Sequence, residues 1–224
     1  RLYSKFPSYA KIKDWGYDLA SNQFENHPTN CKFDMDDFRS RVRYYLWTGL
    51  DQKARQEIAE LKKRSGPGTQ LKVDQIQAQY FLQEGEVQRG FDILKPYYST
   101  MKNDFDFLLL FASAAARAGE SQAAVGAYYS VFKLSPRSKK GRNALYQAAF
   151  LSYQFQDYDG ANRRFIEFIR LHPRSGLAQD ARWHLAWLRY LRGDFEGAYQ
   201  SFKQLSLRSR GRKSRGASQD RVHY

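Results

Sequence analysis

One short pattern recurs along the chain at a fixed interval of 37 residues. It consists of a small residue, an aromatic residue four places later and, in two of the three copies, a proline eight places beyond. The copies are Ala124/Tyr128/Pro136, Ala161/Phe165/Pro173 and Ala198/Phe202. A fixed period of about 20 to 50 residues is typical of stacked repeats, in which each unit buries its apolar face against its neighbours. The pattern therefore predicts a stacked-repeat fold and argues against an active site built from these residues.

Residues 142–178 show what one repeat folds into. Residues 142–154 contain no proline or glycine and have apolar side chains on most faces, which suits a helix that is packed on both sides. A second helix follows, because three apolar residues recur at i, i+4 and i+7: Ala161, Phe165 and Phe168. We expect Leu145, Ala148 and Ala149 to fill the core of this helical hairpin.

The turn between the two helices has its own signal. Gly119 and Gly193 occupy this turn in two of the blocks, and Gln156 stands in the same slot in a third. Glycine at this position allows the positive φ that ends a helix tightly. A helical hairpin thus explains both the apolar stripes and the glycines.

The same template divides the chain into five blocks of 34 to 37 residues: 35–70, 71–104, 105–141, 142–178 and 179–215. Residues 1–34 do not fit the period, and we expect them to form a helix and a loop that cap the stack. Residues 216–224 resemble the start of a further helix that is cut short. The chain begins with Arg rather than Met, so a fragment or a processed product is expected.

The template resembles the tetratricopeptide repeat. That family has a Gly-Asp-Tyr…Ala…Phe…Pro hallmark, which is similar to Gln156-Asp157-Tyr158 followed by Ala161, Phe165 and Pro173, and to Gly193-Asp194-Phe195 followed by Ala198 and Phe202. The resemblance implies an all-α, right-handed α-superhelix, or solenoid, of about five helical hairpins.

A narrower resemblance concerns the junction at residues 172–183 and the closing residues 220–224. Both are similar to the non-catalytic superhelical part of soluble lytic transglycosylases, bacterial enzymes of the periplasm that cleave peptidoglycan. The Gly-Leu-Met-Gln run and the Ala-Tyr-Asn segment of that family's catalytic module do not occur here. The resemblance therefore implies a periplasmic scaffold, with any catalytic domain C-terminal to this chain.

Sequence motifs for catalysis are missing. The four histidines are scattered without a second histidine or cysteine at ligand spacing, so neither a metal site nor a cofactor is expected. The chain has no phosphate-binding Gly-x-x-x-x-Gly-Lys-Ser/Thr loop and no Gly-x-Ser-x-Gly nucleophile elbow. A single cysteine excludes an internal disulfide framework. We predict no catalytic residue in these 224 residues.

Two aromatic trios are the most suggestive candidate binding residues. Each trio recurs at i, i+4 and i+7 on the first helix of its block, and the two sets are Tyr146, Phe150, Tyr153 and Trp183, Trp187, Tyr190. In tetratricopeptide proteins the first helices line the inner surface, so the resemblance places all six rings in a groove for a sugar strand, a peptide or a partner helix. The alternative is that the rings are core residues.

Positive charge is the other candidate feature. The chain has 37 Lys and Arg against 23 Asp and Glu, a formal net charge of +14, which favours acidic partners. Arg39, Arg43 and Arg117 fall on the inner stripe of their blocks. A further cluster, which we expect to be a loop or tail, comprises Arg208, Arg210, Arg212, Lys213 and Arg215. This basic segment suits a polyanion, and the alternative is a solvated loop.

These observations favour a non-catalytic scaffold that binds a polymer or a protein, with peptidoglycan or an envelope protein as the partner. One alternative is a stand-alone adaptor of envelope assembly or division machinery. A weaker alternative is nucleic-acid binding through residues 208–215. No apolar run reaches the roughly 18 residues of a membrane span.

Overall fold

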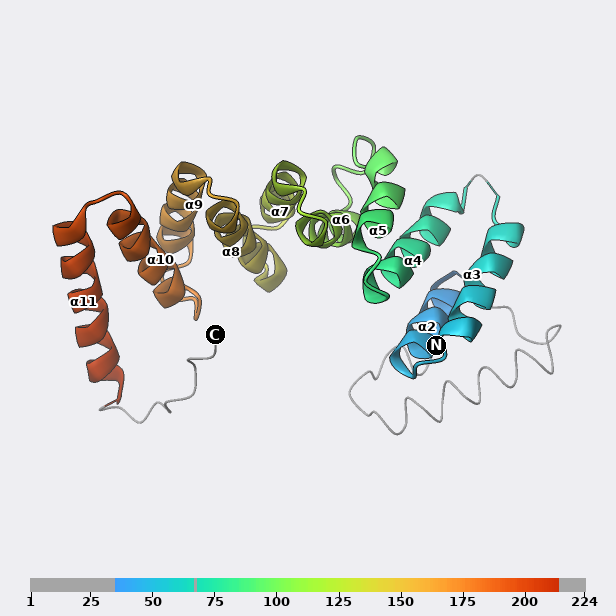
Figure 1. Ribbon diagram of the computed structural model, residues 1–224, viewed down its shortest axis with the longest axis horizontal. Coiled ribbons are helices and arrows are strands. Elements are labelled where there is room, and N and C mark those ends of the chain that lie inside the picture. The colour runs from blue at the N-terminus through green and yellow to red at the C-terminus, as the bar shows by residue number, and fades with distance from the viewer. Residues whose placement is uncertain (1–34, 67, 214–224) are drawn as a thin grey trace. The chain divides into compact units, whose positions relative to one another are not determined.

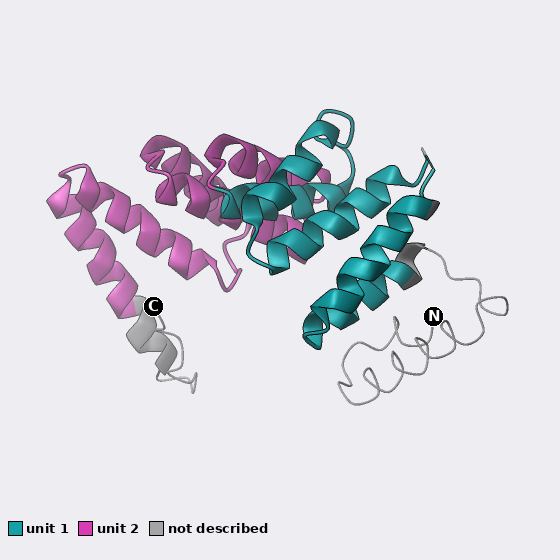
Figure 2. Cartoon of the chain, turned by 45° about the vertical axis from the view of Figure 1, so that its right-hand side comes forward, with its two compact units in different colours: residues 1–118 teal, residues 119–224 magenta. Residues whose placement is uncertain are grey.

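The computed structural model describes residues 35–66 and 68–213, and the elements expected in residues 1–34 and 216–224 lie outside the described residues. Over the described ranges the structure has ten α-helices, one 3-10 helix and no β-strand, which confirms the predicted all-α fold (Figure 1). The chain divides into two compact units, residues 1–118 and 119–224 (Figure 2). No helix in the described part of the chain is long and apolar enough to cross a membrane.

In unit 1 the described helices pack one after another along the chain. The first helices of successive hairpins also contact each other, α2 with α4 and α4 with α6, so these three line one face of the unit. The helices of unit 1 are α2 (Met35–Trp47), α3 (Asp51–Arg64), α4 (Gln70–Gln83), α5 (Val87–Leu94), the 3-10 helix η2 (Lys95–Tyr97) and α6 (Phe105–Arg117).

Unit 2 has the same construction, since each of its helices packs on the one that follows. In Figure 1, α10 and α11 run side by side as an antiparallel hairpin. The helices of unit 2 are α7 (Ser121–Leu134), α8 (Lys139–Gln154), α9 (Tyr158–Leu171), α10 (Ala178–Leu191) and α11 (Phe195–Lys213).

The predicted apolar stripes form the interior of unit 2. Ala161, Phe165 and Phe168 of α9 are fully buried. They lie against α8, whose predicted core residues Leu145, Ala148 and Ala149 are also fully buried. The hairpin pattern therefore identified correctly which side of each helix faces the other.

The turn between the helices has the predicted backbone. Gly193 has a φ of 81°, and Gln156, one block earlier, has a φ of 64°. Glycine adopts this left-handed conformation without a steric penalty, whereas a residue with a Cβ atom does not. Gln156 is the one non-glycine residue with positive φ in the described part of the chain.

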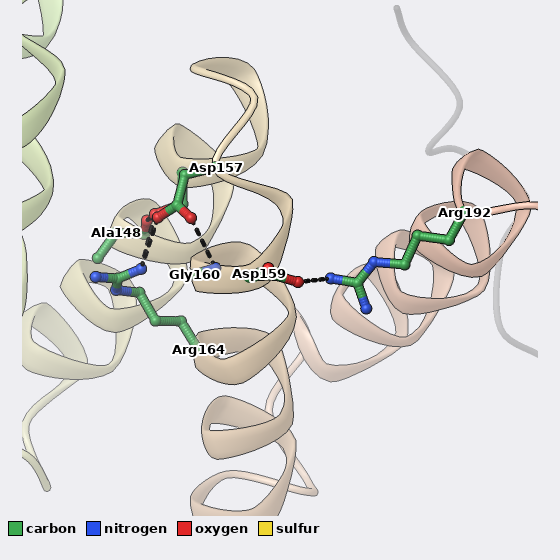
Figure 3. A network of polar contacts seen from close by, with 7 residues as sticks. Ala148, Asp157, Asp159, Gly160, Arg164 and Arg192 are labelled. Atoms are coloured by element: carbon green, nitrogen blue, oxygen red, sulfur yellow. Dashed lines mark hydrogen bonds and ion pairs between the residues drawn. The ribbon is translucent and has the colours of Figure 1, made fainter.

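A polar network holds the α8–α9–α10 segment together (Figure 3). Asp157 caps α9, because its carboxylate accepts a 2.9 Å hydrogen bond from the Gly160 backbone N–H. Arg164 lies 3.5 Å from the other oxygen of Asp157 and donates a 3.0 Å hydrogen bond to the Ser152 hydroxyl on α8. Arg192 pairs with Asp159, and this ion pair joins the end of α10 to the start of α9 (Figure 3).

The structure corrects one prediction at the end of unit 2. The basic segment was expected to be a loop or tail, but α11 continues as a helix through Lys213. Leucine and arginine are good helix formers, and a single glycine within a helix costs only about 1 kcal/mol, so Gly211 does not end the helix. Arg215 lies outside the described residues.

Candidate functional site

The three arginines predicted to lie on the inner stripes of their blocks surround one cavity of unit 1, which we call the arginine cleft. Its volume is about 390 Å³, within the range of small-ligand pockets. Nine described residues line it, and none of them carries a carboxylate: Arg39, Val42, Arg43, Leu46, Ile76, Gln79, Leu82, Gln83 and Arg117.

Helix periodicity explains how these residues meet. Arg39 and Arg43 are one turn apart on α2, so their side chains share a face. Val42 is fully buried beside them and forms part of an apolar floor to which α4 contributes Ile76. Arg117 comes from the last turn of α6. Three first helices therefore supply one cleft, although 78 residues separate Arg39 from Arg117.

The cleft arginines differ from three other arginines of unit 1. Arg41 pairs with Glu57 at 3.3 Å, Arg55 pairs with Glu84 at 3.6 Å, and Arg89 pairs with Glu86. In contrast, none of the three cleft arginines forms an ion pair with a residue in the described ranges. The Nε atom of Arg39 is also buried with no hydrogen-bond acceptor in that part of the chain. The cleft is thus a site of positive charge to which the described residues bring no carboxylate.

Three guanidinium groups that have no ion-pair partner among the described residues, above an apolar floor, suit a particular kind of ligand. A guanidinium group binds a planar carboxylate through two parallel hydrogen bonds. The buried leucine and isoleucine side chains offer contacts to apolar groups of the same ligand, and the two glutamine amides can donate or accept hydrogen bonds. The arrangement therefore fits a short segment in which acidic and apolar side chains alternate.

Unit 2 has a second basic cavity, of about 600 Å³, where the turn before α10 meets the start of α8. It is lined by three cations, Lys139, Arg142 and Arg174, but also by the carboxylate of Asp180. His172 lines it too, and burial together with the charge of Arg142 lowers the pKa of that imidazole. With a carboxylate already present, this cavity is the weaker anion site.

The first aromatic trio is half-buried and packs against rings of α9 and α10, so a groove shared by all six rings stays a prediction. Tyr146 packs against Phe165 and Phe168 of α9, with ring centroids 5.8 Å and 5.6 Å apart. Burial raises the pKa of Tyr146 to about 12. Helix α10 covers the trio, and the ring of His184 lies 5.4 Å from both Phe150 and Tyr153.

Two rings of the second trio are exposed, and the third, Trp187, is half-buried. Trp183 and Tyr190 keep 45% and 47% of their surface accessible. Trp183 stacks on Trp187 with centroids 5.9 Å apart, and Trp187 stacks on Tyr190 at 5.1 Å. The six rings thus form two groups, and the most exposed of them, Trp183 and Tyr190, lie on α10.

The predicted basic segment lies at the end of α11. The backbone of residues 208–213 is helical, which places Arg208, Arg210, Arg212 and Lys213 along α11. Nucleic-acid binding through this segment therefore stays a prediction.

Known structures resemble this arrangement of helices. The crystal structure of MamA has a TM-score of 0.64 and 14% identity, over 84% of this chain and 98% of that one. The TPR-like repeats of a Podosopora anserina putative kinesin light chain give 0.64 and 15%, over 86% of this chain and all of that one. A further MamA structure gives 0.57 and 16%, over 82% and 93%.

The fold is that of tetratricopeptide-like repeat proteins. At 14–16% identity the similarity concerns the fold. No family model matches the sequence, and no curated protein matches it.

The sequence pattern predicted the three arginines as binding residues but missed other members of the two sites. The glutamines and apolar residues that α4 adds to the cleft carry no signal in the repeat pattern. His184 was also missed, because the equivalent residue one period earlier is the exposed Gln147. The one hint in the sequence is that His184, a polar ring, lies between Trp183 and Trp187.

Proposed function

We propose that this chain is a non-catalytic helical-repeat scaffold that binds an acidic segment of a protein partner in the arginine cleft. The observation that carries the proposal is the meeting of three arginines, none of them ion-paired with a described residue, around one apolar-floored cavity. The tetratricopeptide-like fold supports it, since stacked repeats create extended surfaces that such proteins use for binding.

Size and charge favour a short peptide motif over a large flat interface. A cavity of about 390 Å³ accommodates a few side chains. Truncating one partner of an exposed ion pair costs up to about 1 kcal/mol, so three arginines contribute up to about 3 kcal/mol, or up to about a hundredfold in Kd. The net charge of +14 adds a long-range attraction that speeds the encounter with an acidic segment.

The test is a binding titration with a fluorescein-labelled peptide of alternating glutamate and leucine, followed by anisotropy. The variant Arg39→Gln/Arg43→Gln/Arg117→Gln should bind more weakly, by up to about a hundredfold. Lys139→Gln/Arg142→Gln/Arg174→Gln removes the same three charges from the second basic cavity and should bind almost as well as the wild type. A peptide of alternating glutamine and leucine has no side-chain carboxylates and should bind neither the wild type nor either variant.

Equal losses in the two variants would show that net charge, and not the cleft, attracts the peptide, and the proposal would be wrong. Tight binding of duplex DNA that survives the cleft substitutions would instead favour the nucleic-acid alternative.

The cell wall is a second candidate partner. The residues at 172–183 resemble the superhelical part of periplasmic lytic transglycosylases, and the stem peptides of peptidoglycan carry carboxylates. On this proposal the chain lies in the bacterial periplasm and positions a catalytic domain on the glycan strands. A stand-alone envelope adaptor with the same cleft is the competing version.

Purified sacculi distinguish these versions. The cell-wall proposal expects the wild-type chain to sediment with sacculi and the triple arginine variant to remain in solution. It also expects no release of muropeptides, because the sequence has no recognisable catalytic motif. Equal sedimentation of both chains, or turnover by either one, would contradict it.

A further inference from the structure

One edge of unit 2 is rich in positive charge. The helices of this unit are joined by short connections, so successive helices run antiparallel and every second turn lies at the same edge. The turn from α7 to α8 and the turn from α9 to α10 therefore share an edge. We call it the basic edge and define it as residues 133–143 and 170–177. These two segments contain seven lysines and arginines and no carboxylate.

At the opposite edge the charges are paired. Asp157 and Asp159 lie where α9 begins, and they pair with Arg164 and Arg192 (Figure 3). On the basic edge, five cations form no ion pair with a residue in the described ranges: Arg137, Lys139, Arg142, Arg170 and Arg174.

The two turns of the basic edge lie side by side. The ring of Phe132, near the end of α7, lies 6.4 Å from the ring of His172 in the α9–α10 turn. The second basic cavity, of about 600 Å³, lies between the start of α8 and this turn. Three cations of the edge line it against the single carboxylate of Asp180, so positive charge is in excess there.

The start of α8 is an unusual place for these cations. The N-terminal end of a helix carries a partial positive charge, so acidic side chains stabilise it and basic ones do not. Helices α9, α10 and α11 have an acidic residue in the first turn, whereas α8 has none and begins with Lys139 and Lys140. Charges placed against the local preference of a helix are typical of functional sites.

His172 adds a hydrogen-bonding group to the same cavity. Its Nε2 atom is buried and has no hydrogen-bond partner among the described residues. A phosphate oxygen in the cavity would accept a hydrogen bond from Nε2–H. The cavity thus combines positive charge with a polar atom for which an anion offers a partner.

Apolar side chains accompany the cations of the basic edge. Leu134 and Leu171 are the last residues of α7 and α9, 37 residues apart, and they keep 42% and 41% of their surface accessible. A free phosphate or a nucleic-acid backbone has no use for exposed leucines. A lipid bilayer offers both anionic phosphates at its surface and apolar chains beneath them. The combination therefore favours a membrane surface over the other anions.

We propose that the basic edge of unit 2 binds the surface of a bilayer that contains anionic phospholipids. A headgroup phosphate lies in the second basic cavity, and Leu134 and Leu171 enter the headgroup region. The chain bound in this way lies on the membrane and does not span it through this edge. The inference goes beyond the arginine cleft, which belongs to unit 1, and does not depend on it.

Co-sedimentation of the full chain with vesicles tests the proposal. Vesicles of phosphatidylglycerol and phosphatidylcholine in equal parts provide the anionic surface, and vesicles of phosphatidylcholine alone provide the neutral one. We expect the wild-type chain to sediment with the anionic vesicles and to remain in solution with the neutral ones. Lys139→Gln/Arg142→Gln/Arg174→Gln should bind the anionic vesicles about a hundredfold more weakly.

Two further variants separate the basic edge from net charge. Arg39→Gln/Arg43→Gln/Arg117→Gln has the same net charge as the cavity variant but an intact basic edge, so it should bind the vesicles like the wild type. Leu134→Gln/Leu171→Gln keeps every charge and should weaken binding by up to about tenfold, because the exposed part of each leucine loses its apolar contact. Circular dichroism should show the helical content of the wild type in all three variants.

Several results would overturn the proposal. Equal losses in the two triple variants would assign the binding to net charge. Unchanged binding of the leucine variant would show that the edge does not enter the bilayer. A wild-type chain that stays in solution with anionic vesicles would also contradict it. If that chain then bound duplex DNA, and the cavity variant did not, the basic edge would be a nucleic-acid site.

Discussion

At the scale of single residues, the backbone of Gln156 is the clearest departure from the repeat pattern. It holds a φ of 64° at a position where Gly193 holds 81° one period later. A side chain in the left-handed region costs about 1–2 kcal/mol, partly offset by the extra freedom that glycine has in the unfolded chain. We expect Gln156→Gly to raise the free energy of unfolding by about 1 kcal/mol in urea titrations. The reverse change, Gly193→Gln, should lower it by a similar amount, and two shifts of the same sign would contradict this account.

His184 makes stability depend on pH. Burial lowers the pKa of its imidazole, and the nearby charge of Asp180 opposes this only in part. The unfolded chain therefore binds a proton near pH 6.5 that the folded chain still excludes, so stability is lost as pH falls through and below this value.

The variant His184→Phe keeps a ring in the same place but removes the proton site. Urea unfolding at pH 7.5 and pH 5 should show a smaller loss of stability in this variant than in the wild type. An equal loss in both proteins would assign the pH dependence to other groups.

At the scale of helices, the close approach within each hairpin depends on one small residue. Gly90, Ala124, Ala161 and Ala198 recur at this position and are all buried. In unit 1 there is not even room for a methyl group, because a Cβ atom on Gly90 would lie 2.9 Å from Cγ of Leu82 on α4.

Enlarging this position should separate the helices. We expect Ala161→Leu to lower the free energy of unfolding by about 1–3 kcal/mol through overpacking. Ile166→Leu is the matched control, because Ile166 lies on the same helix with half of its surface exposed, and it should change stability by less than about 0.5 kcal/mol. A tolerated leucine at position 161 would show that the hairpin does not close on this residue.

The sequence predicted the hairpins well because their causes are local. Apolar spacing and turn residues act over a few positions, so the buried stripe of α9 and the left-handed turn at Gln156 were both foreseen. The end of α11 was not, since glycine and serine in residues 207–213 suggested a loop while the helix propensity of leucine and arginine prevailed.

The candidate sites depend on neighbours that the period does not reveal. Tyr146 and Trp183 are equivalent in the repeat, yet one lies beneath α10 and the other is exposed. Which ring is covered depends on whether a further helix follows. The arginine cleft was partly foreseen because its cations fall on inner stripes, but its apolar floor comes from contacts between α2 and α4 that no single block encodes.

At the scale of the whole molecule, positive charge acts in two ways. The net charge of +14 produces a long-range attraction that salt screens, since the Debye length is about 10 Å at about 0.1 M ionic strength. Local hydrogen bonds in the arginine cleft are screened much less. We therefore expect added salt to weaken binding of the glutamate–leucine peptide to every variant, while the wild type keeps its advantage over the triple arginine variant. If the difference in affinity between the wild type and the triple arginine variant vanishes at high salt, the three arginines act only through diffuse charge, which would contradict the account.

The central claim is that an acidic segment binds at Arg39, Arg43 and Arg117, and side-chain NMR tests it most directly. Nitrogen-15 spectra of the arginine Nε–H groups, assigned by single Arg→Lys substitutions, are recorded while the glutamate–leucine peptide is added. The account predicts large, saturable shifts for these three groups, with Arg39 prominent because its buried Nε lacks an acceptor in the described structure, and small shifts elsewhere. Shifts spread evenly over the exposed arginines, with Arg39 unaffected, would contradict it.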